Sequence, residues 1–245
     1  MTWTLATYEP AALFSLRPSN STTSGGKSLI APTAFSIKMA LLSVSIQTAG
    51  LAEGQRRFPQ IRDLRIALAL PEQIVLVKSF AKIRRPIRLG SGDAREAEIA
   101  EALEVGHFPF APTIAYREFV QFGGFLQFAL TSSQGEAPVW LNEALLAVNY
   151  LGKRGSFVQI TGRPDMIDEP GSAFTEITRD STDFVFDGTL QMMDDCGSMM
   201  TFEHADIYNP KRISLGKERV IRHIVLPYRL AQSSRGYSRY ERVLA

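Results

Sequence analysis

Several short segments alternate apolar and polar residues in the way that half-buried β-strands do. These are residues 3–16 (WTLATYEPAALFSL, with a bend expected at Pro10), 64–70 (LRIALAL), 73–85 (QIVLVKSFAKIRR) and 156–162 (SFVQITG). Residues 113–132 give two more strand-like runs, interrupted at Gly123-Gly124. We expect a hairpin turn or a glycine bulge at that point.

Three other segments are predicted to be helical. Residues 32–47 (PTAFSIKMALLSVSIQ) open with proline and threonine and are apolar on nearly every face, which is typical of a buried helix. Residues 94–105 predict a short helix on an insertion, and residues 138–152 one that stops at Gly152. The resulting order, β-α-β-β-α-β, predicts an α+β fold with a ferredoxin-like (RRM-like) domain in residues 1–162. Its insertion covers about residues 84–111, and residues 163–245 are expected to form a β-rich C-terminal extension packed on the same domain.

Charge changes this picture because it is segregated along a chain whose net charge is only +2. Residues 53–90 hold nine Lys or Arg against three acids, and residues 211–245 hold nine against two. Residues 164–209 hold eleven acids and a single arginine. Two basic blocks around an acidic one predict a polyanion-binding face and a separate face for a basic partner.

Catalytic chemistry finds little support in the sequence. The segment STTSGGKS (21–28) resembles a nucleotide-binding loop, but Ser21 stands where that motif requires glycine. Pro32 also falls where a true nucleotide-binding loop would already be two turns into its helix. The three histidines and the single Cys196 form no local nucleophile–base arrangement. A metal site could be assembled from Asp194, Asp195, His204 and Asp206. The same pattern is equally expected from acidic residues scattered in loops. We therefore expect no catalytic residue, no metal and no cofactor.

Nucleic-acid binding is better supported by three stretches. Lys153 and Arg154 stand between two glycines where a helix gives way to a strand, an arrangement suited to a phosphate, although an ordinary helix cap would look the same. Lys38 lies inside an apolar helix, where its ammonium must reach solvent or meet an anion. The tail interleaves Arg235 and Arg239 with aromatic residues, a pattern that suits stacking on unpaired bases. A disordered tail would have a similar sequence.

These features together resemble the RAMP superfamily of CRISPR-associated RNA-binding proteins. The resemblance rests on the opening 13–42 (a strand, a loop, then PT leading into an apolar helix), on TIAYREFVQFGGFLQFAL (113–130) and on NYLGKRGSFVQI (149–160). It covers about residues 3–162, and the opening looks like the start of the small subunit that grips the 5′ handle of the guide RNA in type I Cascade complexes. It implies a ferredoxin-like fold with a thumb-like insertion, in a ribonucleoprotein complex of antiviral defence.

By position, the resemblance implies a set of RNA contacts. Lys27 is added as a phosphate contact from the flexible opening loop, although a solvated lysine would look similar. The full set of expected RNA-binding residues is Lys27, Lys38, Arg84, Arg85, Arg88, Lys153, Arg154, Arg235, Tyr237 and Arg239.

The expected function is thus a non-catalytic guide-RNA-binding subunit. The crRNA and the backbone and large Cascade subunits are its expected partners, target DNA is contacted at most indirectly, and no membrane is involved. Two alternatives stay open: the repeated backbone subunit of the same complex, and a metal-independent endoribonuclease that processes precursor RNA. One cysteine, no apolar run long enough for a bilayer and no signal-peptide pattern favour the cytoplasm.

Overall fold

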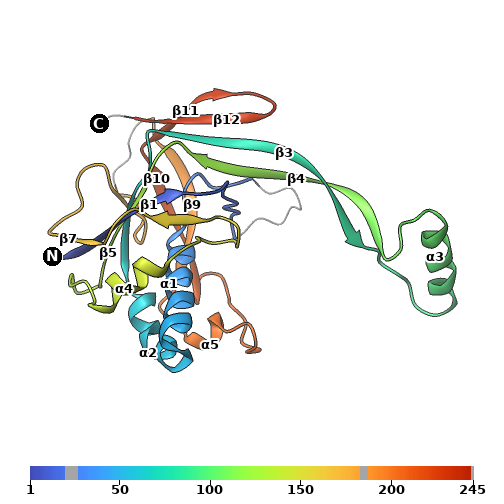
Figure 1. The fold of residues 1–245 in the computed structure, drawn as a ribbon, viewed down its shortest axis with the longest axis horizontal. Coiled ribbons are helices and arrows are strands. Elements are labelled where there is room, and N and C mark those ends of the chain that lie inside the picture. Colours follow the sequence, from blue (N-terminus) through green and yellow to red (C-terminus); the bar gives the residue numbers. More distant parts are fainter. Residues whose placement is uncertain (20–26, 183–186, 244–245) are drawn as a thin grey trace.

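The computed structural model describes residues 1–19, 27–182 and 187–243. It is a mixed α/β structure with antiparallel sheets (Figure 1). The central sheet has the order β6-β1-β5-β2-β8, and β7 also pairs with β1. Its strands are β1 (Trp3–Pro10), β2 (Arg65–Ala69), β5 (Leu126–Thr131), β6 (Val158–Ile160), β7 (Asp165–Ile167) and β8 (Thr175–Glu176). Because β1 and β2 lie on either side of β5, strands distant in sequence share one sheet.

Helices α1 (Ala34–Ala49), α2 (Leu51–Arg62) and α4 (Trp140–Ala147) lie together on one side of this sheet (Figure 1). The helix predicted at 32–47 is confirmed as α1. Thr33 caps it by accepting a hydrogen bond from the Ser36 N–H, and Gly50, at φ 88°, ends it. Leu41 of α1, Phe128 of β5 and Leu141 of α4 are each fully buried in the shared core. A smaller cluster around Trp3 covers the opposite face of the sheet.

A long hairpin projects from this body (Figure 1). Its strands β3 (Gln73–Pro86) and β4 (Phe110–Phe122) pair along their whole length, and α3 (Asp93–Glu104) occupies the connection between them. Strands β11 (Tyr228–Ser233) and β12 (Tyr237–Arg242) complete a second sheet of order β11-β12-β3-β4. The strand at 73–85 and the helix at 94–105 are thereby confirmed. Alternation buries Ile74 and Leu76 at the root of the hairpin, whereas its outer half is exposed.

The rest of the chain packs against the helices. Strands β9 (Thr189–Cys196) and β10 (Arg219–Leu226) form a two-stranded ladder beside α1, and α5 (Phe202–Ala205) contacts α2. Phe202 meets Phe58 of α2 edge to face, with ring centroids 6.1 Å apart. None of the helices in the described part of the chain is long and apolar enough to cross a membrane.

Three local expectations need correction. The runs on either side of Gly123-Gly124 do not pair as a hairpin, because β4 pairs with β3 whereas β5 pairs with β1 and β2. The fourth helix ends at Ala147 rather than at Gly152, since Val148 is already extended. Helix α2 was not predicted, because its apolar face is narrow: only Gly54, Phe58 and Ile61 of its residues are buried.

Candidate nucleic-acid interface

The Gly152–Gly155 loop is held tightly and exposes its two cations. Gly152 and Gly155 have φ of 70° and 106°, a region that residues with a Cβ rarely adopt. The backbone closes the loop through a hydrogen bond from the Ser156 N–H to the Lys153 carbonyl at 3.1 Å. The Ser156 hydroxyl accepts from the Ser15 N–H at 3.2 Å and so ties the loop to the segment that follows β1. Lys153 and Arg154 point into solvent from this fixed support.

A cavity of about 290 Å³ opens beside this loop. Its lining includes Lys153 of the loop, Arg17 after β1, Thr33 and Ser36 at the start of α1, and Arg219 of β10. The N-terminus of α1 adds the partial positive charge of a helix end. Cations from three distant segments therefore converge with a helix N-terminus, and such a cavity is suited to an anionic group.

Asp194 partly neutralises this cavity by holding Arg219. The Arg219 Nε donates to Asp194 Oδ2 at 2.6 Å, and the guanidinium lies 4.0 Å from the centroid of the Phe35 ring. Asp194 is buried, whereas Arg219 is partly exposed. Arg219 is thus fixed in position with one edge toward the cavity, and Lys153 is the more exposed of the two cations.

The chain re-enters the described part at Lys27, which is exposed. The other residues of the STTSGGKS loop, 21–26, lie outside the described residues. Ser28 then joins two regions: its hydroxyl accepts from the Leu16 N–H at 3.2 Å, and its N–H donates to Glu118 Oε2 of β4 at 2.8 Å. The other Glu118 oxygen accepts from the Tyr116 hydroxyl at 2.8 Å. This strap places Lys27 between the cavity and the hairpin.

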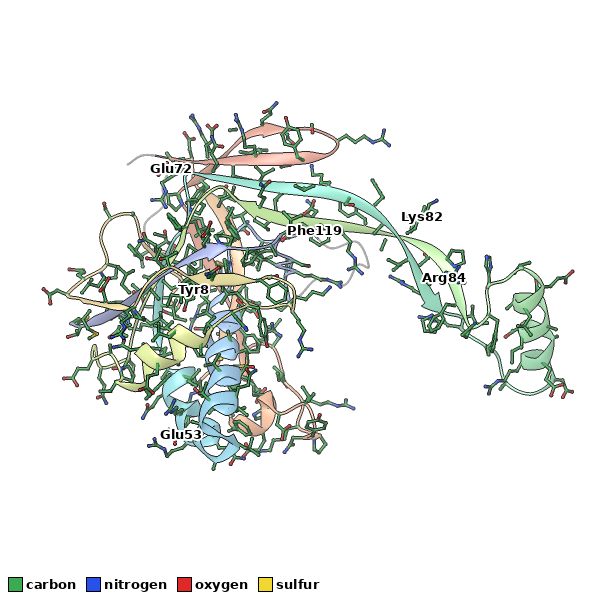
Figure 2. The ribbon with its side chains drawn as sticks, in the orientation of Figure 1. Tyr8, Glu53, Glu72, Lys82, Arg84 and Phe119 are labelled. Carbon is green, nitrogen blue, oxygen red and sulfur yellow. The ribbon has the colours of Figure 1, made fainter. Side chains whose placement is uncertain are left out.

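Basic side chains continue along the outer half of the hairpin. Arg84 and Arg85 lie near the end of β3 and Arg88 in the following loop, and all three are exposed. Because successive strand residues point to opposite faces, Arg84 shares a face with Lys82, and Arg85 lies on the other face. Figure 2 shows Lys82 and Arg84 on the part of the hairpin that stands clear of the body.

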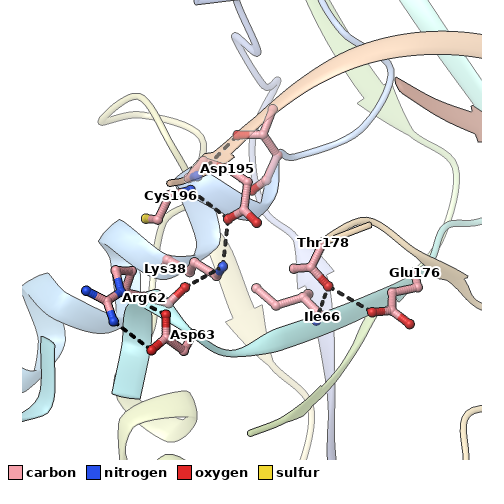
Figure 3. Close-up of polar contacts among 10 residues, drawn as sticks. Lys38, Arg62, Asp63, Ile66, Glu176, Thr178, Asp195 and Cys196 are labelled. Atoms are coloured by element: carbon pink, nitrogen blue, oxygen red, sulfur yellow. Dashed lines mark hydrogen bonds and ion pairs between the residues drawn. The ribbon is translucent and has the colours of Figure 1, made fainter. Parts of the chain in front are cut away.

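Lys38 does not belong to this surface. Its side chain is only 2% exposed, and its ammonium bonds Asp195 Oδ1 at 2.6 Å and the Arg62 carbonyl at 2.8 Å (Figure 3). Burial raises the pKa of Asp195, although Lys38 opposes that shift. The interpretation of Lys38 as an RNA contact is therefore corrected: the anion that it meets is a carboxylate of the same chain.

The C-terminal residues form a strand rather than a disordered tail. Tyr237 and Arg239 lie on β12 opposite Val77 and Val75 of β3, and Arg235 is exposed at the turn before it. Tyr240 packs against the core, and Arg239 pairs with Glu241 at 3.1 Å. The interleaved arginines and tyrosines are thus divided between two faces of a sheet.

The residues considered for catalysis or metal binding are scattered. His204 caps α5 through Thr201, and His223 of β10 contacts Asp180. Burial raises the pKa of Cys196 to about 12, which keeps its thiol protonated at neutral pH. Among the described residues, no three His, Cys, Asp or Glu side chains are grouped as metal ligands. Asp194 and Asp195 are instead engaged by Arg219 and Lys38.

Sequence reasoning missed four residues of this surface: Arg17, Phe80, Tyr116 and Glu118. Arg17 was not distinguished from other loop cations, and the other three acquire meaning only through the register of β3 against β4. The local signal for Phe80 is an aromatic residue that stands between Lys78 and Lys82 at alternate positions of the strand.

Comparisons with known proteins place the chain near CRISPR-associated proteins. No family model matches. The CRISPR-associated protein Cas5 of Archaeoglobus fulgidus is 34% identical over 94 residues, which span 36% of this chain and 41% of that relative. A crystal structure of a CRISPR protein from Archaeoglobus fulgidus aligns over 99% of this chain and 92% of its own, with 11% identity and a TM-score of 0.48.

A subunit of a CRISPR RNA-guided surveillance complex aligns over 98% of this chain and 90% of its own, with 12% identity and a TM-score of 0.46. Both TM-scores lie below 0.5, so the similarity to CRISPR-associated proteins rests on the sequence match. That match to a Cas5 protein confirms the resemblance to CRISPR-associated RAMP proteins that the motifs of this chain indicated.

Proposed function

We propose that this chain is a non-catalytic guide-RNA-binding subunit of a CRISPR interference complex that holds the 5′ handle of the crRNA. The observation that carries the proposal is the convergence of Lys153, Arg17 and the start of α1 around one cavity, with Arg154 exposed on the loop beside it. Phosphate contacts supply a large share of the affinity of nucleic-acid-binding proteins and need cations and N–H groups rather than acid–base residues.

The proposed fold type is a ferredoxin-like domain extended at its C-terminus. The strand order β6-β1-β5-β2 is the order that a β-α-β-β-α-β unit gives when its two helices cover one face. In that comparison α1 and α4 are the two crossover helices. The insertion is then the whole β3–β4 hairpin, so it begins before residue 84 and ends after residue 111, wider than the range expected from the sequence. The assignment of residues 163–245 to the same unit is supported by Ile177, Met193 and Tyr228, which contribute to the common core.

Contacts with other protein subunits form part of the proposal. Helix α3 at the tip of the hairpin has no buried residue in the free chain. It also carries five acidic side chains, at Asp93, Glu96, Glu98, Glu101 and Glu104. These acids would repel a phosphate backbone, so the tip is better suited to a protein surface, whereas the basic strands behind it suit RNA.

The test removes the loop cations. Lys153→Ala with Arg154→Ala should weaken binding of the cognate repeat RNA by about 1–3 kcal/mol and flatten the salt dependence by roughly one to two units. The control is Lys211→Ala with Arg212→Ala, because it removes another exposed Lys-Arg pair, near α5, where Lys211 lies 3.5 Å from Glu203. Equal losses in the two variants, or no loss in the first, would reject the loop as a specific contact.

A further inference from the structure

Two aromatic rings face each other across the outer half of the hairpin. Phe80 of β3 lies directly opposite Tyr116 of β4, with ring centroids 5.3 Å apart and an angle of 60° between the ring planes. Phe80 is 66% exposed, although phenylalanine is usually among the most buried residues. Tyr116 therefore supports one side of Phe80, and much of the Phe80 surface is open to solvent.

The Tyr116 ring is held in place from the body side. Its hydroxyl donates to Glu118, a buried carboxylate that also accepts the Ser28 N–H. Burial, reinforced by the bond to Glu118, raises the pKa of Tyr116 to about 12, so the hydroxyl remains a donor throughout the neutral range. A ring fixed by such bonds loses little conformational freedom when a ligand stacks beside it.

Cations continue the same face of the hairpin. Lys82 and Arg84 follow Phe80 at alternate positions of β3, so their side chains leave the sheet on the Phe80 side. Both are exposed, and no ion pair is formed by either within the described ranges. Hydrogen bonds also link the rings to the cationic cavity. Glu118, the acceptor for Tyr116, accepts from the Ser28 N–H, and the Ser28 hydroxyl accepts from the N–H of Leu16, which lines the cavity. A polyanion that leaves the cavity thus meets flat rings and then two positive charges.

We propose that Phe80 and Tyr116 form a stacking platform for an unpaired base of the bound RNA, with the adjoining phosphates on Lys82 and Arg84. This inference rests on the proposed function and adds a base-binding subsite to it. Stacking between aromatic rings and bases tolerates any sequence, because every base has a π-face. The flanking cations favour a nucleic acid over an apolar protein segment, which would have to desolvate both of them.

The platform is tested with Phe80→Ala, Phe80→Trp and Ile114→Ala, and with a short single-stranded RNA that carries a fluorescent adenine analogue. Ile114 is the matched control, since it lies on the same face of β4 and is 67% exposed but has no ring. Phe80→Ala should weaken single-stranded RNA roughly 5- to 150-fold and reduce quenching of the base analogue, with the salt slope unchanged. Phe80→Trp should retain both affinity and quenching, and Ile114→Ala should change affinity less than about twofold.

The outcomes separate this inference from the proposed function. If the wild-type chain binds the RNA and Phe80→Ala binds equally well, the platform is rejected and the function stands. If Ile114→Ala loses as much as Phe80→Ala, the surface is a general apolar contact, and the stacking role is rejected. If Phe80→Ala instead weakens binding of a partner subunit and leaves RNA binding unchanged, the surface is a protein-docking site and the stacking role is rejected. Absence of any wild-type RNA binding would overturn the function and the platform together.

Discussion

The two halves of the β3–β4 hairpin have the same alternating sequence pattern but opposite environments. Near the root, Ile74 and Val120 are fully buried in the core of the body, together with Leu76. Further out on the same face, Phe80 and Ile114 are about two-thirds exposed, and the cations begin. Figure 2 shows Phe119 on the part of the hairpin close to the body and Arg84 on the part that stands clear of it.

The difference shows that apolar residues in the outer half are not explained by the stability of this chain alone. At the root they fill a core, where each side chain contributes to folding through the area it removes from water. In the outer half they remain in contact with water and lie among charges. Exposed apolar groups of this size, rimmed by charged residues, are typical of interaction surfaces.

The largest expected effect concerns a charge inside the body. Asp195→Asn leaves the buried Lys38 ammonium without its counter-charge and should lower the free energy of unfolding by about 3–5 kcal/mol. Asparagine can still accept the Cys196 N–H, so the loss reports mainly on the charge. Urea titration measures it.

Two further variants sharpen this test of the body against the hairpin. Lys38→Met combined with Asp195→Asn should recover much of the loss, because no unpaired charge remains. Arg84→Ala, on the outer hairpin, should change stability by no more than about 0.5 kcal/mol. A double variant as unstable as Asp195→Asn alone would contradict the ion-pair explanation.

The next effect compares two isoleucines on one face of the hairpin. Ile74→Ala should cost about 2–5 kcal/mol of stability, since it leaves a cavity in the core. Ile114→Ala should cost less than about 0.5 kcal/mol, because water already reaches that side chain. Thermal or urea unfolding of both variants checks the contrast. Similar losses would mean that the outer half is packed against something within the folded chain.

The smallest expected effect is at Lys27, between the cationic cavity and the hairpin. Lys27→Ala should lower RNA affinity by about 0.5–1 kcal/mol, to a similar extent for RNAs of different sequence, without changing stability. A phosphate contact with an exposed lysine is a single charge interaction that solvent and salt screen. Fluorescence anisotropy with two unrelated single-stranded RNAs measures the loss. A loss limited to one RNA would indicate base recognition instead.

The sequence by itself determined the elements whose signals are local. Alternation over 73–85, the proline–threonine start of the apolar helix and the glycines around Lys153 each depend on near neighbours, and the structure has all three. The resemblance of its motifs to the CRISPR-associated RAMP proteins was also available from the sequence. Local periodicity and turn chemistry are enough for such features, because backbone geometry fixes them within a few residues.

Only the tertiary structure decided which distant residues meet. Lys38 finds Asp195 157 positions away, and Tyr116 reaches Glu118 and thereby Ser28, 90 positions from that carboxylate. Phe80 and Tyr116 face each other because one particular register joins β3 to β4, and a slip of one residue would send them to opposite faces. The partner of a charged or aromatic residue cannot be read from its sequence neighbours. The partner depends on how the sheets and helices pack, and that packing determines which cations are buried as ion pairs and which remain exposed at the proposed RNA surface.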